Sequence, residues 1–451
     1  MIRESGLELE DQRAAAETAE WTRRRRRKAP IAAFWSFVFP GAGQLYNHQP
    51  GLAAAFGIPI AVLLIAAAVS ALAFREALLP RLLDTRVIIG LIAANIAILV
   101  WRVAAMLQAH RRRARLRPNR VGTQVTAALV ILALLMHVVP TAYGFKVLET
   151  LSAVSLGGSD GSSDLRDSIP ALRAPAGAPL PEPLQQPDTD AGERVNILLV
   201  GVDSGVGRDH ALTDTMLVVS MDSDGATAMV SIPRDLVDAP LPDGEPYPRK
   251  LNSLLQTASA DPAGYPMGAV ATLKATIGNL LGVPIHYFAA VDMAGFRQVI
   301  DAIGGVEVAV EVPVADPQHN VYLEPGPVFM DGELALRYVR SRFGVGNNDF
   351  VRAGRQQEVI AAVRAKLTAT NVLTALPGLL NAVQSTIATD VPSDRIPELA
   401  ELVQNADMDS VDRVVIDPPE YVTPATGAGG AYILIPDFES IRELGQSLLA
   451  D

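Results

Sequence analysis

The chain has 451 residues, enough for two or three domains, and it contains no cysteine, which excludes a disulfide framework, a thiol nucleophile and a thiolate metal site. Residues 1–150 carry 19 Lys or Arg and 9 Asp or Glu, whereas residues 151–451 carry 19 and 40. A basic N-terminal part joined to an acidic C-terminal part argues against nucleic acid as a partner of the C-terminal part.

The N-terminal part has the composition of a membrane region, which we place at residues 31–148. Residues 31–74, 87–101 and 121–145 contain no Asp, Glu, Lys or Arg, and a helix needs roughly 20 apolar residues to cross a bilayer. The pattern predicts transmembrane helices at 51–74, about 87–108 and about 123–145. Residues 31–47 are interrupted at Phe39-Pro40-Gly41, so we expect this segment to be re-entrant or interfacial.

Two basic runs, at Arg23 to Lys28 and at residues 110–120, set the expected orientation. Because basic loops stay on the cytoplasmic side, residues 1–30 are predicted to be cytoplasmic and the chain after the third helix extracellular. A nucleic-acid patch is the alternative interpretation of the two runs, and it is disfavoured because apolar segments adjoin both. The PGAGQLYN segment resembles membrane-hairpin modules with a PGxGQxYxG signature, and both a function and a simple helix break are open for it.

Residues 149–194 are rich in Pro, Gly and Ser, as in a flexible linker. After them, strands alternate with helices, which indicates an α/β fold, an α-β-α sandwich with a mixed central sheet. We place the main domain at 195–370 and its C-terminal extension at 371–451. Strands are predicted at 195–201, 215–221, 226–232, 285–291 and 306–312, and helices at 267–281, 293–302, 331–340, 352–368, 394–405 and 437–449.

The cations of the acidic part are unevenly distributed, which favours an anion site over an ordinary solvated surface. Arg340 and Arg342 cannot both face the core if they lie at an extended helix exit, and Arg352 and Arg355 share one face of a helix start. Eight of the 19 basic residues in this part lie at Arg234, Arg249, Lys250, Arg337, Arg340, Arg342, Arg352 and Arg355.

Two aspartates flank neighbouring predicted strands. Asp203 follows the first buried strand, and Asp214 precedes the next one. Carboxylates at adjacent strand ends can bind a hard divalent cation together with water and phosphate oxygens. A loop or capping role for each aspartate is the alternative.

A series of short motifs in the C-terminal part closely resembles, in the same order, the LytR-CpsA-Psr family of wall-polymer ligases, and it covers residues 196–366. The motifs are Asn196-Ile197-Leu198-Leu199-Val200-Gly201-Val202-Asp203-Ser204, Thr213-Asp214-Thr215-Met216, Ser231-Ile232-Pro233-Arg234-Asp235, Lys250-Leu251-Asn252, the DAIGGVEV of 301–308, Tyr338-Val339-Arg340-Ser341-Arg342 and Asp349-Phe350-Val351-Arg352-Ala353-Gly354-Arg355-Gln356-Gln357.

The resemblance implies an apolar cleft for a polyprenyl chain and a Mg²⁺ (or Mn²⁺) ion at the pyrophosphate of the lipid carrier. By the same resemblance, Asp203 and Asp214 are expected to bind the metal. Asp349 is the candidate for orienting or deprotonating the acceptor hydroxyl, and Asp235 for organising Arg234. The expected phosphate contacts are Arg234, Arg340, Arg342, Arg352 and Gln356, and the further substrate-binding candidates are Lys250, Asn252, Arg355 and Arg208.

One position departs from the family pattern. Members carry Arg two residues before the second metal-binding Asp, and this chain has Leu212 there. Arg208, in the preceding loop, is the candidate to replace its phosphate contact.

The expected activity is transfer of a glycopolymer, with its linking phosphate, from a polyprenyl-pyrophosphate carrier to a hydroxyl of peptidoglycan or another surface polymer. Phosphoryl transfer needs mainly charge neutralisation, which arginines and a divalent cation supply. Two alternatives stay open: a non-catalytic membrane regulator, which the predicted topology disfavours, and a hydrolase of the same lipid pyrophosphate. The expected partners are the lipid-linked glycopolymer, peptidoglycan and membrane lipid, without nucleic acid.

Overall fold

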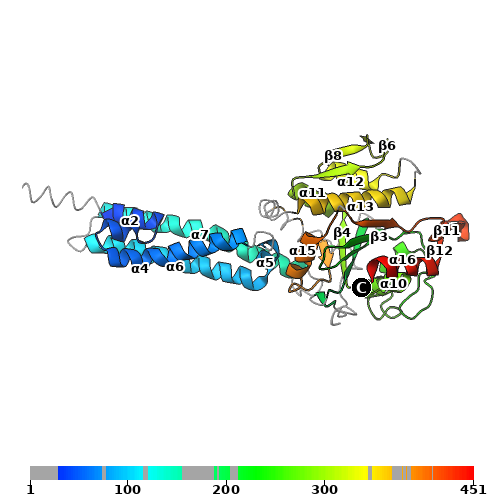
Figure 1. Cartoon of the computed structure of the whole chain (residues 1–451), viewed down its shortest axis with the longest axis horizontal. Helices are drawn as coiled ribbons and strands as arrows, with labels where there is room; N and C mark the ends of the chain where they lie inside the picture. Colours follow the sequence, from blue (N-terminus) through cyan, green and yellow to red (C-terminus); the bar gives the residue numbers. More distant parts are fainter. Residues whose placement is uncertain are drawn as a thin grey trace, which may run out of the picture. The chain divides into compact units, whose positions relative to one another are not determined.

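The computed structural model describes residues 29–73, 78–114, 120–154, 187–189, 192–203, 212–343, 348–367, 378, 382, 387–408 and 410–450. The chain divides into two compact units, a helical unit and an α/β unit (Figure 1). The helical unit comprises residues 1–78 and 85–146, and the α/β unit comprises residues 79–84 and 147–451. The predicted cytoplasmic segment and most of the predicted linker lie outside the described residues.

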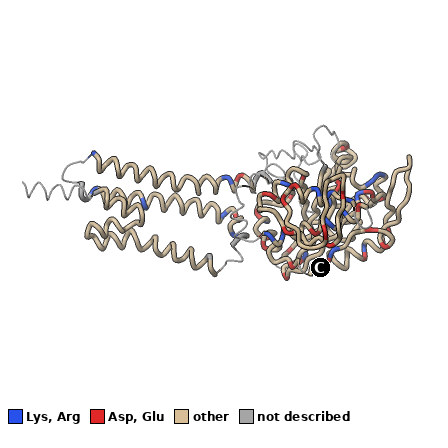
Figure 2. The backbone as a smooth tube through the Cα atoms, turned by 90° about the horizontal axis from the view of Figure 1, so that it is seen from above, with Lys and Arg blue, Asp and Glu red and all other residues tan. Residues whose placement is uncertain are grey.

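Three of the described helices are long and apolar enough to cross a membrane, over Pro50–Ser70, Thr85–Arg111 and Arg120–Leu151. Figure 2 shows few charged residues along these helices. The N-terminal helices are α2 (Ala29–Val38), α3 (Ala42–Tyr46), α4 (Pro50–Ala73), α5 (Leu78–Leu83), α6 (Thr85–Ala114) and α7 (Arg120–Val154).

In the PGAGQLYN segment, Pro40 and Gly41 form a tight turn between α2 and α3 and the following residues form α3. Its polar side chains bond to α6. A Cβ atom at Gly43 would lie 2.0 Å from the Ala32 carbonyl oxygen, so only glycine allows this approach. The Gln44 side chain donates to the Ala105 carbonyl at 2.8 Å, and Asn47 donates to Ala109 at 2.9 Å. Buried amides thus find partners, which is what a segment in an apolar environment requires.

A six-stranded sheet in the order β10-β3-β2-β1-β4-β9 forms the centre of the α/β unit. Strand β1 runs parallel to β4 and antiparallel to β2, and β10 runs parallel to β3, so the sheet is mixed as expected. The bounds are β1 (Val195–Asp203), β2 (Leu212–Met221), β3 (Thr227–Ser231), β4 (Tyr287–Asp292), β9 (Ile387–Thr389) and β10 (Asp412–Val415).

Helices cover both faces of the sheet, which confirms the expected α-β-α layering (Figure 1). Neighbouring residues of β1 serve the two faces: Leu198 packs in the core beneath α10 and α16, whereas Leu199 lines a cavity on the other face. The helices are α10 (Ala269–Leu281) and α16 (Phe438–Leu449) on the first face, and α11 (Met293–Ala302), α12 (Gly332–Arg340) and α13 (Asp349–Lys366) on the second.

Helix α13 begins three residues before its predicted start at 352. The Asn348 side chain accepts from the N–H groups of Phe350 and Val351, both at 3.1 Å, and so caps the helix at Asp349. This cap brings Asp349 into the first helical turn, beside Arg352.

Residues beyond 370 belong to the same domain, because they supply both edge strands, β9 and β10, and part of the core. The backbone N–H of Leu434 in β12 donates to the Asp235 carbonyl at 3.0 Å, so the last hairpin lies against the Arg234-Asp235 loop. The remaining elements are α9 (Leu254–Ala260), α15 (Ile396–Asn405) and the hairpin strands β5 (Val306–Val310), β6 (Val314–Asp316), β7 (Val321–Leu323), β8 (Gly326–Met330), β11 (Val422–Thr426) and β12 (Tyr432–Pro436).

Candidate functional site

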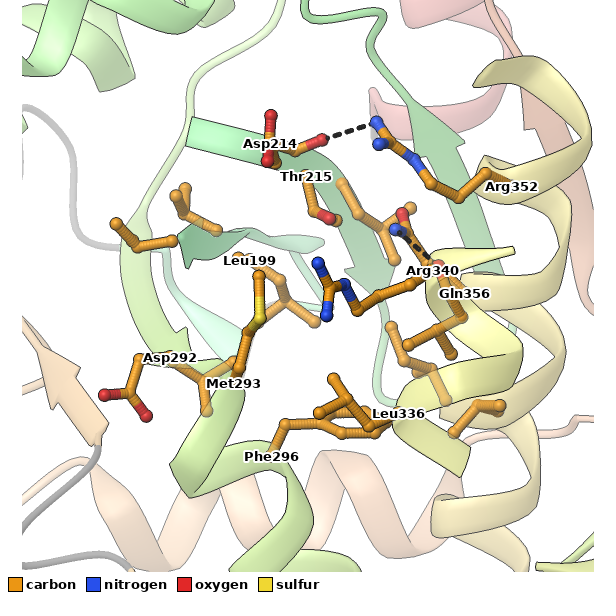
Figure 3. A pocket seen from close by; sticks show the side chains of 18 of the residues that line it. Leu199, Asp214, Thr215, Asp292, Met293, Phe296, Leu336, Arg340, Arg352 and Gln356 are labelled. Atoms are coloured by element: carbon orange, nitrogen blue, oxygen red, sulfur yellow. Dashed lines mark hydrogen bonds between the residues drawn. The ribbon is translucent and has the colours of Figure 1, made fainter. Parts of the chain in front are cut away.

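A cavity of about 770 Å³ lies between the sheet and the helices α11, α12 and α13. Figure 3 shows Phe296, Met293 and Leu336 on the side of the cavity away from Asp214. The apolar lining consists of Leu199, Val200, Val202, Leu217, Ala289, Ala290, Val291, Met293, Phe296, Val299, Ile300, Leu336, Val339, Phe343, Val359, Ile360, Val363 and Ile387.

Cationic side chains gather at the other side of this cavity. Arg340 extends from the last residue of α12 into the cavity, with Arg352 and Gln356 on the neighbouring α13 (Figure 3). The backbone is extended at Ser341, directly after α12, and Arg342 lines the cavity from beyond this point. An apolar interior with a cationic mouth suits a ligand that joins a hydrocarbon chain to phosphate.

A β-bulge presents Asp214 to the cavity. Gly201 pairs with Thr215, but the next residue, Val202, pairs with Thr213, so Asp214 is the extra residue of β2. Consecutive residues of a regular strand point to opposite faces, whereas Asp214 and Thr215 both line the cavity. The bulge therefore supplies a carboxylate and a hydroxyl at one point of the wall.

Arg234 joins two carboxylates that are distant in the sequence. Its terminal nitrogen lies 2.5 Å from Asp214 Oδ1, and its Nε lies 2.8 Å from Asp349 Oδ2, with Asp235 Oδ2 at 3.8 Å. Burial opposes the charge of this guanidinium, but the bond to Asp214 and the charges of Asp349 and Asp235 raise its pKa. Arg234 is thus a fixed cation at the mouth of the cavity.

Asp349 organises three guanidiniums. Its Oδ1 lies 2.7 Å from Arg342 Nε, and its Oδ2 lies 2.8 Å from Arg234 Nε and 3.5 Å from a terminal nitrogen of Arg352. Both carboxylate oxygens are therefore engaged by cations. The structure thus places Asp349 among the arginines, whose guanidiniums it holds, and its expected role of orienting or deprotonating the acceptor hydroxyl stays a prediction.

Arg352 is almost fully buried, and it donates to the Asp214 carbonyl oxygen at 2.9 Å. Burial lowers the pKa of its guanidinium. The negative charge of Asp349 partly offsets this decrease, and the positive charges of Arg234 and Arg342 lower the pKa further. Its Nε is buried and bonds to no atom of the described residues. A buried donor without a partner beside an anion site is suited to a ligand that brings an oxygen.

Lys250 and Asn252 lie on the outer side of the Arg234-Asp235 loop. Lys250 Nζ lies 2.6 Å from Asp235 Oδ1. The N–H of Asn252 donates to the Arg234 carbonyl at 3.2 Å, and the Asn252 carbonyl accepts from Thr213. Both residues therefore anchor the loop that carries Arg234, and neither lines the cavity.

Arg355 and Gln356 have different places although they are adjacent. The buried Arg355 guanidinium donates to the carbonyls of Ser341 (2.8 Å) and Phe343 (2.6 Å). It thereby holds the segment that carries Arg342, and it does not line the cavity. Gln356 does line the cavity, and its amide approaches the Val339 carbonyl at 3.4 Å.

The predicted metal site is described only in part. Asp203 ends β1 opposite Leu212 in β2, so it reaches the same end of the sheet as Asp214, but its side chain and the whole of Arg208 lie outside the described residues. Within the described residues no group of three or more His, Asp or Glu side chains could hold a metal ion. The donors at this strand end, carboxylates and the Thr215 hydroxyl, are nevertheless of the oxygen type that Mg²⁺ prefers.

Sequence reasoning missed several residues at the site. Gln318 and His319 reach the cavity wall from the β6–β7 hairpin, and Asp292 reaches it from the end of β4. The hydroxyl of Tyr432 in β12 lies near Asp235 and Asp349, whose charges, together with burial as the larger cause, raise its pKa. The β6–β7 hairpin is too short to give a strand signal, and a lone histidine has no spacing to mark it.

The chain is similar to curated transferases of teichoic acid. It is 30% identical over 214 residues to a polyisoprenyl-teichoic acid–peptidoglycan teichoic acid transferase TagU of Bacillus cereus, covering 47% of this chain and 66% of that protein. The TagU of Bacillus anthracis is 29% identical over 259 residues, covering 56% of this chain and 80% of that protein.

Among solved structures, B. subtilis TagV is 23% identical with a TM-score of 0.45, over 57% of this chain and 98% of that one. TagT bound to LI-WTA is 20% identical with a TM-score of 0.45, over 59% of this chain and 92% of that one. The model of the LytR-CpsA-Psr family matches residues 178–445, which is more than half of the chain. The chain belongs to the LytR-CpsA-Psr family.

Proposed function

We propose that the protein transfers a glycopolymer, with its linking phosphate, from a polyprenyl-pyrophosphate carrier to a hydroxyl of peptidoglycan or of another cell-surface polymer. One observation carries the proposal: an apolar cavity of about 770 Å³ with a cluster of guanidiniums at its mouth. A cavity of this size is typical of a small-molecule or lipid site. Membership of a family whose relatives are named teichoic acid transferases supports the same activity.

In this proposal the hydrocarbon tail occupies the apolar part of the cavity and the pyrophosphate meets Arg234, Arg340, Arg342 and Arg352. The acceptor hydroxyl attacks the phosphorus that carries the glycan, a new P–O bond forms, and the bond to the bridging oxygen breaks. Polyprenyl phosphate leaves with the electrons of that bond, and its new terminal oxygen takes up the proton that the acceptor hydroxyl loses. Negative charge grows on the leaving phosphate, and preorganised guanidiniums stabilise it more than they stabilise the bound donor.

Asp349 acts through the arginines it holds. Both of its oxygens are engaged, so it keeps Arg234 and Arg342 at the positions where the phosphates arrive. Arg355 also keeps Arg342 in position, because it donates hydrogen bonds to the carbonyls of the two residues that flank Arg342. We assign these two residues to positioning and the cavity-lining arginines to substrate contact.

The proposal includes a divalent cation, Mg²⁺ or Mn²⁺, held by Asp214 and Asp203. The bulge turns Asp214 toward the cavity at the strand end where Asp203 also ends, and these hard oxygen donors fit such an ion. When bound, the ion would neutralise pyrophosphate charge. Arg234 bonds to Asp214 Oδ1, so the other oxygen of that carboxylate is the one left for the ion.

The test uses the full chain in lipid nanodiscs with a radiolabelled polyprenyl-pyrophosphate oligosaccharide and peptidoglycan acceptor. We expect label on the peptidoglycan in the presence of Mg²⁺, and loss of turnover with Asp203→Asn, Asp214→Asn or excess chelator. Free oligosaccharide phosphate as the sole product would identify a hydrolase instead. Full turnover in chelator would remove the metal from the proposal.

A further inference from the structure

An aspartate–histidine pair lies on the β6–β7 hairpin, and its histidine lines the cavity. The Asp316 side chain is fully buried, and its Oδ2 lies 2.7 Å from His319 Nδ1. Its Oδ1 accepts from the backbone N–H groups of Gln318 (2.9 Å) and His319 (3.1 Å). One carboxylate thus shapes the turn and fixes the imidazole ring.

The pair determines which ring nitrogen of His319 is available. A carboxylate accepts hydrogen bonds, so Nδ1 is the donor in this contact, and Nε2 is left for another partner. No hydrogen bond joins Nε2 to the described residues, and about a quarter of the side chain is exposed in the cavity wall. Burial on its own would raise the pKa of Asp316, but hydrogen bonds from Ser341 and His319 bring it below its ordinary value. Asp316 therefore stays a carboxylate.

Asp316 also links His319 to the arginines at the mouth. Its second side-chain partner is Ser341, the residue between Arg340 and Arg342. His319, Arg340 and Arg342 all line the same cavity. The hairpin is held from the other side too, because Arg337 donates to the Asn320 carbonyl at 3.1 Å. The imidazole consequently lies beside the cationic mouth in a fixed orientation.

A purely structural role explains the backbone hydrogen bonds to Asp316, but it does not explain the histidine at position 319. The backbone bonds to Asp316 stabilise the turn without any need for an imidazole at position 319. A histidine placed on the wall of a largely apolar cavity leaves a polar nitrogen without a protein partner, which is unfavourable unless a ligand supplies one. The neighbouring arginines indicate the chemistry of that ligand, an anion.

We propose that His319, oriented by Asp316, binds the donor by a hydrogen bond from Nε2 to the pyrophosphate, beside Arg340 and Arg342. This inference rests on the proposed function, because it takes a lipid pyrophosphate as the ligand of the cavity. His319 is a substrate-contacting residue, and Asp316 is a positioning residue that acts through it. Since Nδ1 is committed to Asp316, Nε2 donates only when the ring is protonated.

Binding should therefore weaken as pH rises from about 5.5 to 8.5, because a neutral ring whose Nδ1 donates to Asp316 has no proton on Nε2. The charged groups around the ring are Asp316 on its own hairpin, Arg337, Arg340 and Arg342 on or just after α12, and Arg355 on α13. Arginines keep their charge throughout this range, and Asp316 stays ionised in it. If affinity changes with pH in the wild type but not in a His319 variant, the change comes from protonation of the imidazole.

The experiment measures binding of a fluorescent C15 polyprenyl pyrophosphate that carries one N-acetylglucosamine, to the full chain in nanodiscs with Mg²⁺. This probe is a pyrophosphate diester, so its own charge is constant between about pH 5.5 and 8.5. For the wild type we expect affinity to fall about tenfold over this range, the size of one hydrogen bond to a charged group. His319→Ala should bind about tenfold more weakly at about pH 5.5 and show no such decline.

His319→Gln keeps a donor near the position of Nε2, so it should recover most of the affinity at pH 5.5 and show no pH dependence. Asp316→Asn should shift the pH profile, which loss of a turn contact alone would not do. Tyr322→Ala, an exposed change on the same hairpin, should behave as the wild type.

Arg340→Ala separates this inference from the proposed function. If Arg340→Ala weakens binding and His319→Ala does not, the assignment of His319 is wrong and the proposed function stands. If neither variant changes affinity, the pyrophosphate does not bind at this mouth and both fail. Normal affinity with reduced turnover in His319→Gln also overturns the assignment, because it would give the residue a part in the chemical step instead of in binding. If His319→Ala does not fold, the pH profile of His319→Gln decides.

Discussion

Arg340→Ala should reduce transfer strongly without reducing the free energy of unfolding. Arg340 extends into the cavity from the end of α12, and no ion pair joins it to another described residue. Its charge therefore acts on the ligand and contributes little to the fold. Surface changes away from buried networks usually alter stability by less than about 0.5 kcal/mol.

The expected loss follows from the kind of contact removed. A charge-assisted contact that strengthens in the transition state is worth about 2–4 kcal/mol in a partly dry site, which corresponds to about a 30- to 1000-fold lower kcat. Arg340→Lys should recover only part of the rate, because an ammonium cannot make the forked contact of a guanidinium. Rates would be measured as label transferred from the lipid pyrophosphate, and stability as Tm of the same samples.

Two other arginines provide the comparison. Arg352→Ala should lower both the rate and Tm, because this buried side chain also bonds to the Asp214 carbonyl. Arg297→Ala removes an equal charge but only an exposed ion pair with Glu333 at 3.0 Å, which is worth about 0–1 kcal/mol, so turnover should be unchanged. A rate for Arg340→Ala equal to that of Arg297→Ala, at matched Tm, would refute the assignment of the phosphate site.

Arg355→Lys should reduce Tm and turnover together, because one ammonium cannot serve the carbonyls of both Ser341 and Phe343; an unchanged Tm would contradict this anchoring role. The folded-state pKa of Asp316 is lowered, so its contribution to stability is present at neutral pH and is lost as pH falls through that value. The difference in free energy of unfolding between the wild type and Asp316→Asn should therefore shrink in acid, as measured by urea unfolding of the full chain. A difference that does not change with pH would contradict this role of the Asp316 carboxylate. A reporter active only outside the cell should work when fused at the C-terminus and fail when fused near residue 115. The reverse pattern would be incompatible with extracellular transfer.

The sequence alone determined which segments form helices and strands in most of the chain. Apolar runs and alternation report local burial, so the strands near Val195 and Val306 and the helices α10, α11 and α12 were predicted close to their observed bounds. The motifs also identified the family and, with it, the arginines and aspartates to examine. The strands β6 to β12 were missed: four of them have only three or four residues, too few for a periodic signal, and β8, β11 and β12 each contain a proline, which weakens a strand pattern.

Only the tertiary structure decided what each charged residue does. Arg352 and Arg355 are one turn apart and have the same charge, yet one faces the cavity and the other holds backbone carbonyls. Asp349 meets Arg234 across 115 positions of sequence, and the bulge at Asp214 depends on the register between β1 and β2. Contacts between distant segments depend on how elements pack, and packing leaves no mark in local residue spacing. For the same physical reason His319, an isolated histidine in the sequence, is found at the cavity wall only in the folded chain.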